Sequence, residues 1–411
     1  MKLFKNLTIM MVMLFCVMIS RRVNAGILWE KELALDANTN SAMLASCLNK
    51  DASGVIVTTI ECPKGSFPKK GVNILWEIGS DGNAARIVPK NTDGSQIWTN
   101  ANPVGPGCAI ASDGLGNLLT VGILSKQKDE QRQRIAVVSM TDSAEKTMSP
   151  RNYIESHSIK KLIPLKDDTF ILIGSRSSND GDGLCLDIDN QGKILQEEQF
   201  DAGRNERFTG ADWITSNNPR LVIVGSSVKH SNESNAGFSG DNFILLYDPN
   251  LKIVHEDYFT GWKSVSALSL ATSQPEVCYL ANGNIVVIYN KEGTDSKTRL
   301  WARCYTQELK LLWEKEIFVT NRFLFYFDVT PWGSAGFVVG MVQRELLEFY
   351  FFDQEGIKLD YARYEGVPGG AVGINGFNLI RVNSRTIAVF DEGTAGNIKE
   401  ASIKAKVIAL D

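Results

Sequence analysis

Residues 26–411 are the part of the chain expected to remain after removal of a signal peptide, and we call them the mature chain. Its two ends look like two halves of one unit that occurs intact elsewhere in the sequence. The unit is an apolar strand, a four-residue turn opened by Asp and a second strand led by Lys, as at residues 240–253. The chain ends with the apolar half, residues 407–411, and residues 26–33 read as the second half with nothing before it. Because each half lacks its partner strand, we expect the two ends to pair side by side.

The same unit recurs along the whole mature chain. Asp at the first turn position can accept a hydrogen bond from the backbone two residues on, and Gly supplies the positive φ that a hairpin turn requires. The further copies are at residues 74–82, 137–146, 181–194, 300–312 and 349–358. Turns start at residues 79, 142, 189, 248, 306, 353 and 411, a spacing of 47 to 63 residues. Four short strands with their connections occupy roughly this length.

A second pattern gives the same count. Between the turns lie β-branched runs that are too short for helices, and no segment of the mature chain keeps a helical period. These runs are residues 54–60, 117–123, 169–174, 221–225, 284–289, 336–342 and 386–390. Seven turns and seven runs predict an all-β fold, a seven-bladed β-propeller. Its N-terminal strand is expected to complete the last blade, because this pairing removes an open sheet edge.

The first 25 residues have the features of a secretory signal peptide. Lys2 and Lys5 precede an apolar run at residues 9–19, and Ala25 suits cleavage before Gly26. The run is too short to span a bilayer comfortably. Arginines directly before the cleavage position leave an uncleaved anchor as the alternative.

We therefore predict a signal peptide at residues 1–25 and a single propeller domain at residues 26–411. The protein is expected to be exported, periplasmic or secreted, with no transmembrane segment after cleavage and a monomeric fold. Removing the signal takes four basic residues and no acidic residue from totals of 43 and 47, which leaves a net charge of −8. This charge argues against nucleic acid as a partner.

Six cysteines remain in the mature chain, widely scattered and without a C-x-x-C pair. This spacing argues against structural zinc and against thioredoxin-like chemistry. Because most lie in apolar runs, buried thiols are favoured, although an oxidising compartment leaves disulfides open.

The sequence of apolar strand, Asp-x-x-Gly, Lys and a strand with Trp-Glu resembles the PQQ-type repeat of quinoprotein-like propellers. Members of that superfamily include quinone-dependent dehydrogenases, an outer-membrane assembly lipoprotein and exported proteins without an assigned activity. The resemblance covers the mature chain at the level of fold. Trp29 and Trp313 hold the place of the repeat's Trp, whereas Gln196 and His255 occupy it elsewhere.

The sequence assigns no catalytic residue and no metal ligand, and we predict no cofactor. His157, His230 and His255 are far apart, and neither H-E-x-x-H nor G-x-S-x-G occurs. The acidic runs at residues 179–183 and 187–192 fit turn chemistry best. They leave Ca²⁺ as an alternative, because Ca²⁺ needs several oxygens at short spacing.

The connections after four of the β-branched runs are long and charged, at residues 61–71, 125–134, 226–241 and 290–299. In a propeller they emerge on one face, where binding usually occurs. The first two are basic and suggest an anionic partner. The candidate binding residues are Lys64, Lys69, Lys70, Lys126, Lys128, Arg132 and Arg134.

We therefore expect a binding or scaffolding module that presents one loop face to an unknown protein or glycan. The alternatives are a propeller enzyme, either a quinone-dependent dehydrogenase or a carbohydrate lyase or hydrolase, and a structural protein of the cell surface. Fold alone does not decide among these classes.

Overall fold

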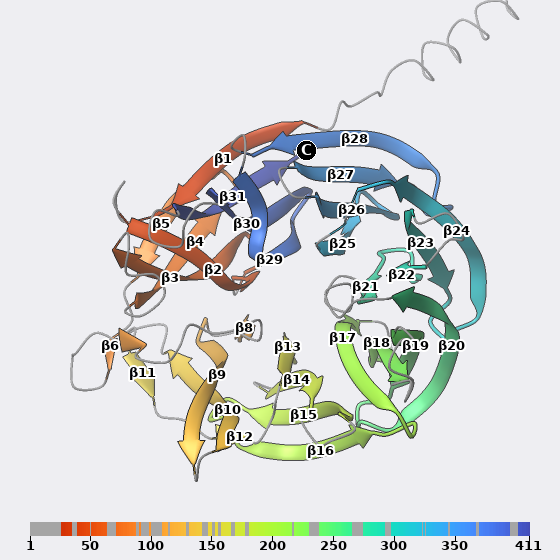
Figure 1. Ribbon diagram of the computed structural model, residues 1–411, viewed down its shortest axis with the longest axis horizontal. Helices are drawn as coiled ribbons and strands as arrows, with labels where there is room; N and C mark the ends of the chain where they lie inside the picture. Colours follow the sequence, from red (N-terminus) through yellow and green to blue (C-terminus); the bar gives the residue numbers. More distant parts are fainter. Residues whose placement is uncertain are drawn as a thin grey trace, which may run out of the picture.

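The computed structural model is an all-β propeller whose sheets are arranged around a central axis (Figure 1). The structure describes residues 26–34, 39–49, 51–63, 71–87, 90–91, 98–99, 109–113, 116–128, 131–141, 147–149, 153–154, 158–165, 169–176, 181–215, 218–229, 238–264, 274–291, 297–322, 324, 326–343, 346–366, 370–394 and 402–411. These residues contain no helix, and hence none that could cross a membrane. The signal peptide predicted at residues 1–25 lies outside them.

The described strands form seven sheets, six of which are regular antiparallel meanders that run outward from the axis. Three of the six consist of β2 (Thr39–Leu48), β3 (Gly54–Pro63), β4 (Gly71–Gly79) and β5 (Ala84–Ile87); β13 (Ser158–Pro164), β14 (Thr169–Ser175), β15 (Gly183–Asp189) and β16 (Ile194–Phe200); and β17 (Asn205–Ile214), β18 (Arg220–Lys229), β19 (Phe238–Tyr247) and β20 (Ile253–Ser264). The other three consist of β21 (Glu276–Tyr279), β22 (Ile285–Asn290), β23 (Thr298–Tyr305) and β24 (Leu311–Thr320); β25 (Tyr326–Trp332), β26 (Gly336–Gln343), β27 (Leu346–Phe352) and β28 (Lys358–Glu365); and β29 (Gly370–Val382), β30 (Arg385–Thr394), β31 (Ile403–Leu410) and β1 (Ile27–Leu33). The short strand β7 (Trp98–Thr99) also pairs with β4.

The seventh sheet is regular only near the axis. There β8 (Ala109–Ser112), β9 (Leu118–Lys128) and β10 (Gln131–Thr141) pair antiparallel. Outside them lie the short strands β11 (Thr147–Ser149), β12 (Tyr153–Ile154) and β6 (Lys90–Asn91), and β6 runs parallel to β11. The outer part of this sheet therefore departs from the repeated unit.

The first strands of neighbouring sheets contact one another around the axis. Each inner strand contacts the next one, in the order β2, β8, β13, β17, β21, β25 and β29, and β29 contacts β2 again. Apolar side chains fill the space between adjacent sheets, as where Ile173 and Cys185 pack with Leu221 and Phe243. The core thus consists of layers between sheets.

The first and the last of the described strands share one sheet. β1 pairs antiparallel with β31, with Glu30 opposite Ile408 and Leu33 opposite Ala405. The Asp411 N–H also donates to the Gly26 carbonyl at 3.3 Å. Leu33 and Ala405 are fully buried, so the pairing adds apolar packing to the ladder.

The predicted turn chemistry is confirmed at three turns. Asp189, Asp248 and Asp353 each accept two backbone N–H groups on Oδ1, from the residues two and four positions on, at 2.8–3.0 Å. These bonds lower the pKa of Asp248, because the backbone amides favour its charged form. The turn predicted to start at residue 142 lies outside the described residues.

Side chains on the outermost strand of one sheet donate hydrogen bonds to the turn of the next sheet. Trp29 Nε1 donates to the Ser80 carbonyl and Trp313 Nε1 to the Gln354 carbonyl, both at 3.1 Å. Gln196, at the corresponding position of its own unit, donates through Nε2 to the Asn250 carbonyl. Gln and Trp at this position therefore make the same kind of contact between sheets.

The cysteines of the described residues carry free thiols. Cys62, Cys185, Cys278 and Cys304 are buried and Cys47 is partly buried. Burial raises the pKa of the Cys62 thiol to about 11. The expectation of buried thiols is confirmed for the four buried residues, while Cys108 lies outside the described part of the chain.

The Trp313 contact can be tested through Gly356, the last residue of the turn that Trp313 covers. Gly356 has φ +72°, and a Cβ there would lie 2.8 Å from the Trp313 ring. We expect Gly356→Ala to lower the free energy of unfolding, measured in urea, by about 2–3 kcal/mol. This is the sum of the cost of the left-handed backbone and the cost of overpacking. In a Trp313→Ala background it should cost about 1 kcal/mol, because only the strain remains.

Gly333 provides the control, because it has φ +60° and a Cβ there would meet nothing within 4 Å. Gly333→Ala should cost about 1 kcal/mol with or without Trp313. Equal costs of Gly356→Ala in the two backgrounds would contradict the proposed packing.

Candidate functional site

One face of the propeller carries the connections between second and third strands, together with those from each fourth strand to the next sheet. This arrangement follows from the antiparallel order of strands in the regular sheets. We call it the loop face. The four long charged connections predicted from the sequence join β3 to β4, β9 to β10, β18 to β19 and β22 to β23, so they share this face.

The basic residues predicted to bind on this face are only partly described. Lys64, Lys69 and Lys70 lie outside the described residues. The remaining four do not lie in a loop as predicted, because the hairpin strands β9 and β10 continue as far as Lys128 and from Gln131. Polar residues of this kind can extend a hairpin beyond the apolar part of its sheet.

The register of this hairpin separates its basic residues. Lys126 is opposite Gln133 and Lys128 is opposite Gln131, whereas Arg132 and Arg134 are opposite Gln127 and Ser125. No two of the four basic residues are therefore direct partners, and an anion site at this position stays a prediction.

The structure brings together a charged group that sequence reasoning missed. Five charged residues lie on four consecutive inner strands: Lys160 and Lys161 on β13, Asp212 on β17, Glu276 on β21 and Asp328 on β25. We call them the axial cluster. They are separated by up to 168 positions in the sequence, and only the ring of inner strands makes them neighbours.

Two members of the axial cluster fasten adjacent sheets together. Asp212 accepts the Trp213 N–H at 2.8 Å and the Tyr279 N–H of the next inner strand at 2.7 Å. Asp328 repeats this arrangement, accepting the Val329 N–H at 2.8 Å and the Leu379 N–H of β29 at 2.6 Å. Both oxygens of each carboxyl group are used, so we call each arrangement an aspartate clamp.

The sequence varies at the clamp position of the other inner strands. Asn378, which precedes the clamped Leu379 amide, donates to Ser46 Oγ on β2 at 2.8 Å. Cys278, which precedes the clamped Tyr279 amide, is buried and free. Contacts between inner strands thus continue around the axis through different side-chain chemistry.

Burial and mutual charge set the protonation of the cluster. Burial raises the pKa of Asp328 to about 6, against the opposing effects of Lys161 and of the two backbone N–H groups. Burial raises the pKa of Asp212 as well, again opposed by Lys161. Lys161 therefore stabilises the charged forms of both clamps, because an opposite charge nearby favours ionisation.

The other two members, Lys160 and Glu276, lie near the loop-face ends of β13 and β21. Burial raises the pKa of Glu276 well above its usual range, and Asp328 raises it further while Lys161 and Lys160 lower it. Protein atoms around the Lys160 ammonium group lower its pKa, although its side chain keeps surface that water can reach. Lys160 Nζ donates to Gln274, which precedes β21.

Two members of the cluster therefore have a structural role, and two others are available to a ligand. Asp212 and Asp328 hold backbone amides, which leaves their carboxyl oxygens engaged. Glu276 and Lys160 clamp no backbone amide and present an acid and an amine toward the loop face. Perturbed ionisable groups gathered at one place are the usual mark of a functional site.

Neither a protein-family model nor a curated protein matches this sequence. Similar solved structures include Hsv2 of Kluyveromyces lactis, at 11% identity over 89% of this chain and 98% of that one, with a TM-score of 0.42. An α-L-arabinofuranosidase from Fusarium graminearum matches at 12% identity over 73% and 92% of the two chains, with a TM-score of 0.44. NanB sialidase from Streptococcus pneumoniae matches at 10% identity over 92% and 70%, with a TM-score of 0.42.

These proteins differ in activity, and at such low scores their ligands carry no argument for this chain. The matches do not confirm the resemblance to quinoprotein-like propellers, which stays a prediction.

The raised pKa of Asp328 predicts a pH dependence of stability. Its pKa is about 6 in the folded state and near 3.8 ordinarily, so the folded state holds more protons between these values. The free energy of unfolding should therefore fall as pH rises, by about 1 kcal/mol between pH 5 and pH 7. We expect Asp328→Asn to flatten this decline in urea unfolding at pH 5, 6 and 7.

Asp248→Asn is the control, since the pKa of Asp248 is lowered and its contribution changes only below about pH 4. A decline of equal size in wild type and Asp328→Asn would show that Asp328 is not the group responsible.

Proposed function

We propose that this protein is an exported binding module that takes up a glycan on its loop face, at the Lys160–Glu276 half of the axial cluster. The observation that carries the proposal is the placement of this amine and this acid at the loop-face ends of β13 and β21, where Lys160 donates to Gln274, two residues before Glu276. Sugar hydroxyls both donate and accept hydrogen bonds, so a carboxyl group beside an amino group suits them.

The chemistry of the cluster favours binding over glycoside hydrolysis. A glycosidase ordinarily uses two carboxyl groups, one as acid and one as base or nucleophile. Asp212 and Asp328 have both oxygens engaged with backbone N–H groups, which leaves Glu276 as the available carboxyl group of the cluster.

We further propose that the scaffold is a closed, seven-bladed ring. The irregular seventh sheet counts as a blade because its inner strand β8 contacts β2 and β13, as the other inner strands contact their neighbours. The pairing of β1 with β31 supports closure by the N-terminal strand. Export and a monomeric fold remain proposals that rest on the predicted signal peptide and on this closed architecture.

The glycan proposal predicts that replacing either group weakens binding. Lys160→Met and Glu276→Gln should each lower the affinity for the best-bound oligosaccharide of a glycan array by about 10-fold or more, because each removes a hydrogen bond to a charged group. Isothermal titration calorimetry measures the affinity, and thermal unfolding shows whether each variant is folded.

Lys252→Met is the matched control, since Lys252 is exposed on the turn between β19 and β20, away from the loop face. It should bind as wild type does. Unchanged affinity in both cluster variants, or no glycan bound above background, would overturn the proposal, and a protein ligand captured on the same face would replace it.

Ring closure predicts that the first strand is essential to stability. Deleting residues 26–33 should lower Tm by about 5 °C or more, because buried Leu33 and the partly buried Trp29 leave the sheet. Glu32→Ala, in the same strand and exposed, should change Tm little. An unchanged Tm after the deletion would show that β1 does not close the ring.

A further inference from the structure

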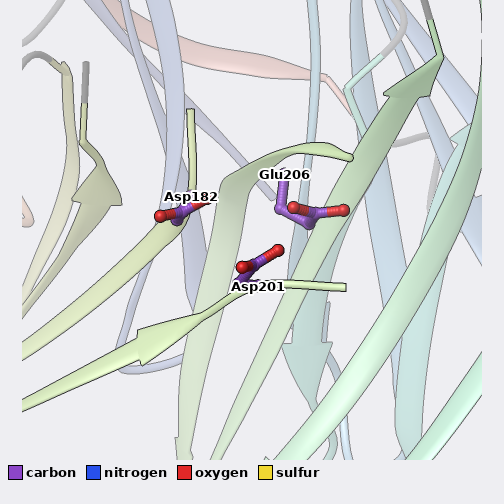
Figure 2. Close-up of side chains that lie close together, drawn as sticks. All are labelled: Asp182, Asp201 and Glu206. Carbon is purple, nitrogen blue, oxygen red and sulfur yellow. The ribbon is translucent and has the colours of Figure 1, made fainter. Parts of the chain in front are cut away.

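Three acidic side chains gather at the loop face between two neighbouring sheets (Figure 2). Asp182 immediately precedes β15, Asp201 immediately follows β16, and Glu206 lies on β17, the first strand of the next sheet. One carboxylate oxygen from each lies within 4.8 Å of the others. Asp182 comes from the acidic run at residues 179–183, for which calcium was an alternative to turn chemistry.

Turn chemistry does not explain why the Glu206 carboxyl group lies in this cluster. It is 0% exposed, and its Oε2 is buried without a hydrogen-bond partner. Its Oε1 accepts a hydrogen bond from Ser227 Oγ at 3.1 Å, and the nearby Ala202 N–H also favours its charged form. A buried carboxylate oxygen without a partner is costly, so its presence points to a missing ligand.

The basic residues nearby are engaged elsewhere. Arg204, between Asp201 and Glu206 in the sequence, pairs with Asp241 at 2.8 Å, and Arg176 pairs with Glu197. Among the described residues, none forms an ion pair with Asp182, Asp201 or Glu206. The three carboxyl groups therefore share one place without a cationic side chain.

Two further hydrogen bonds orient the aspartates. Gln199 Nε2 donates to Asp182 Oδ2, and Asp201 Oδ1 accepts the Gly203 N–H at 2.7 Å. One oxygen of each aspartate is thus held by the protein. Two carboxylates held beside a buried third repel one another, and a bound cation would offset that repulsion.

We propose that Asp182, Asp201 and Glu206 bind one Ca²⁺ ion that bridges the β13–β16 sheet to the β17–β20 sheet. Ca²⁺–oxygen distances are about 2.3–2.6 Å, so two oxygens on one ion can be up to about 5 Å apart, which includes the observed separations. Mg²⁺ binds at about 2.0–2.1 Å and requires a tighter octahedral set. Water and backbone carbonyls would complete the larger Ca²⁺ shell.

The site is distinct from the axial cluster, and its test is independent of glycan binding. The protein is stripped of metal with a chelator and titrated with CaCl₂ in a calorimeter. We expect one Ca²⁺ per chain, with Kd at or below about 1 mM, as in extracellular calcium modules. Tm should rise by about 3 °C at 100 times Kd.

Asp201→Asn should weaken Ca²⁺ binding by about 10-fold or more, because it removes one of three ligand charges. Glu206→Gln should abolish the Ca²⁺-dependent rise in Tm while raising the Tm of the metal-free protein, because it removes an uncompensated buried charge. Since Asp201 is exposed, Asp201→Asn keeps the test decisive even where the buried substitution prevents folding.

Glu197→Gln is the matched control, a nearby exposed carboxylate paired with Arg176. It should bind Ca²⁺ as wild type does. No heat and no change in Tm up to 10 mM CaCl₂ (about tenfold above the weakest expected Kd), equal binding of MgCl₂, or wild-type affinity in Asp201→Asn would each overturn the proposal.

Discussion

The aspartate clamps are the contact on which the centre of this propeller depends. Among the described strands, the backbone ladder of each sheet stops at its inner strand, so contacts between adjacent sheets there involve side chains. An inner-strand amide that faces the next sheet would lack a partner, and an unsatisfied buried amide costs about as much as a lost hydrogen bond. Asp212 and Asp328 supply that partner and set the spacing between sheets at the same time.

This solution places negative charge in a partly buried position, and Lys161 compensates for part of it. Lys161 lowers the pKa values of three carboxyl groups on three different strands. The pKa values of Asp212, Glu276 and Asp328 nevertheless stay raised. Asp328, which joins two sheets, therefore also raises the pKa of Glu276 at the loop-face end of β21.

Local patterns predicted much of the architecture, because hairpin turns are local chemistry. Asp at the first position of the turn and Gly or Leu at the fourth are visible in the sequence, and Asp248 and Asp353 behave as expected. The pairing of the two chain ends could be inferred in the same way, from two incomplete copies of one unit. The resemblance, which the comparisons do not confirm, drew attention to Trp29 and Trp313, and each donates to a carbonyl in the turn of the next sheet.

The sites could not be predicted in this way, because their members are far apart in the sequence. Lys161 and Asp328 become neighbours only when several sheets have assembled. Asp182 was visible within an acidic run, but nothing local indicated that Glu206, from the next sheet, would be buried beside it. The ends of the β9–β10 hairpin were misjudged for another reason, since polar strands that extend past the sheet look like loops.

The shared sheet at the chain ends has a consequence for how this protein is made. β1 is synthesised before the other described strands, and β31, with which it pairs, is synthesised after them, so Glu30 and Lys406 meet across 376 positions. Until β31 has been made, β1 has no strand to pair with, whereas the strands of the other sheets are already present. An unpaired strand with exposed aliphatic residues such as Leu28 invites association with other chains. Cellular chaperones that hold such segments would therefore matter most for this protein until β31 has emerged.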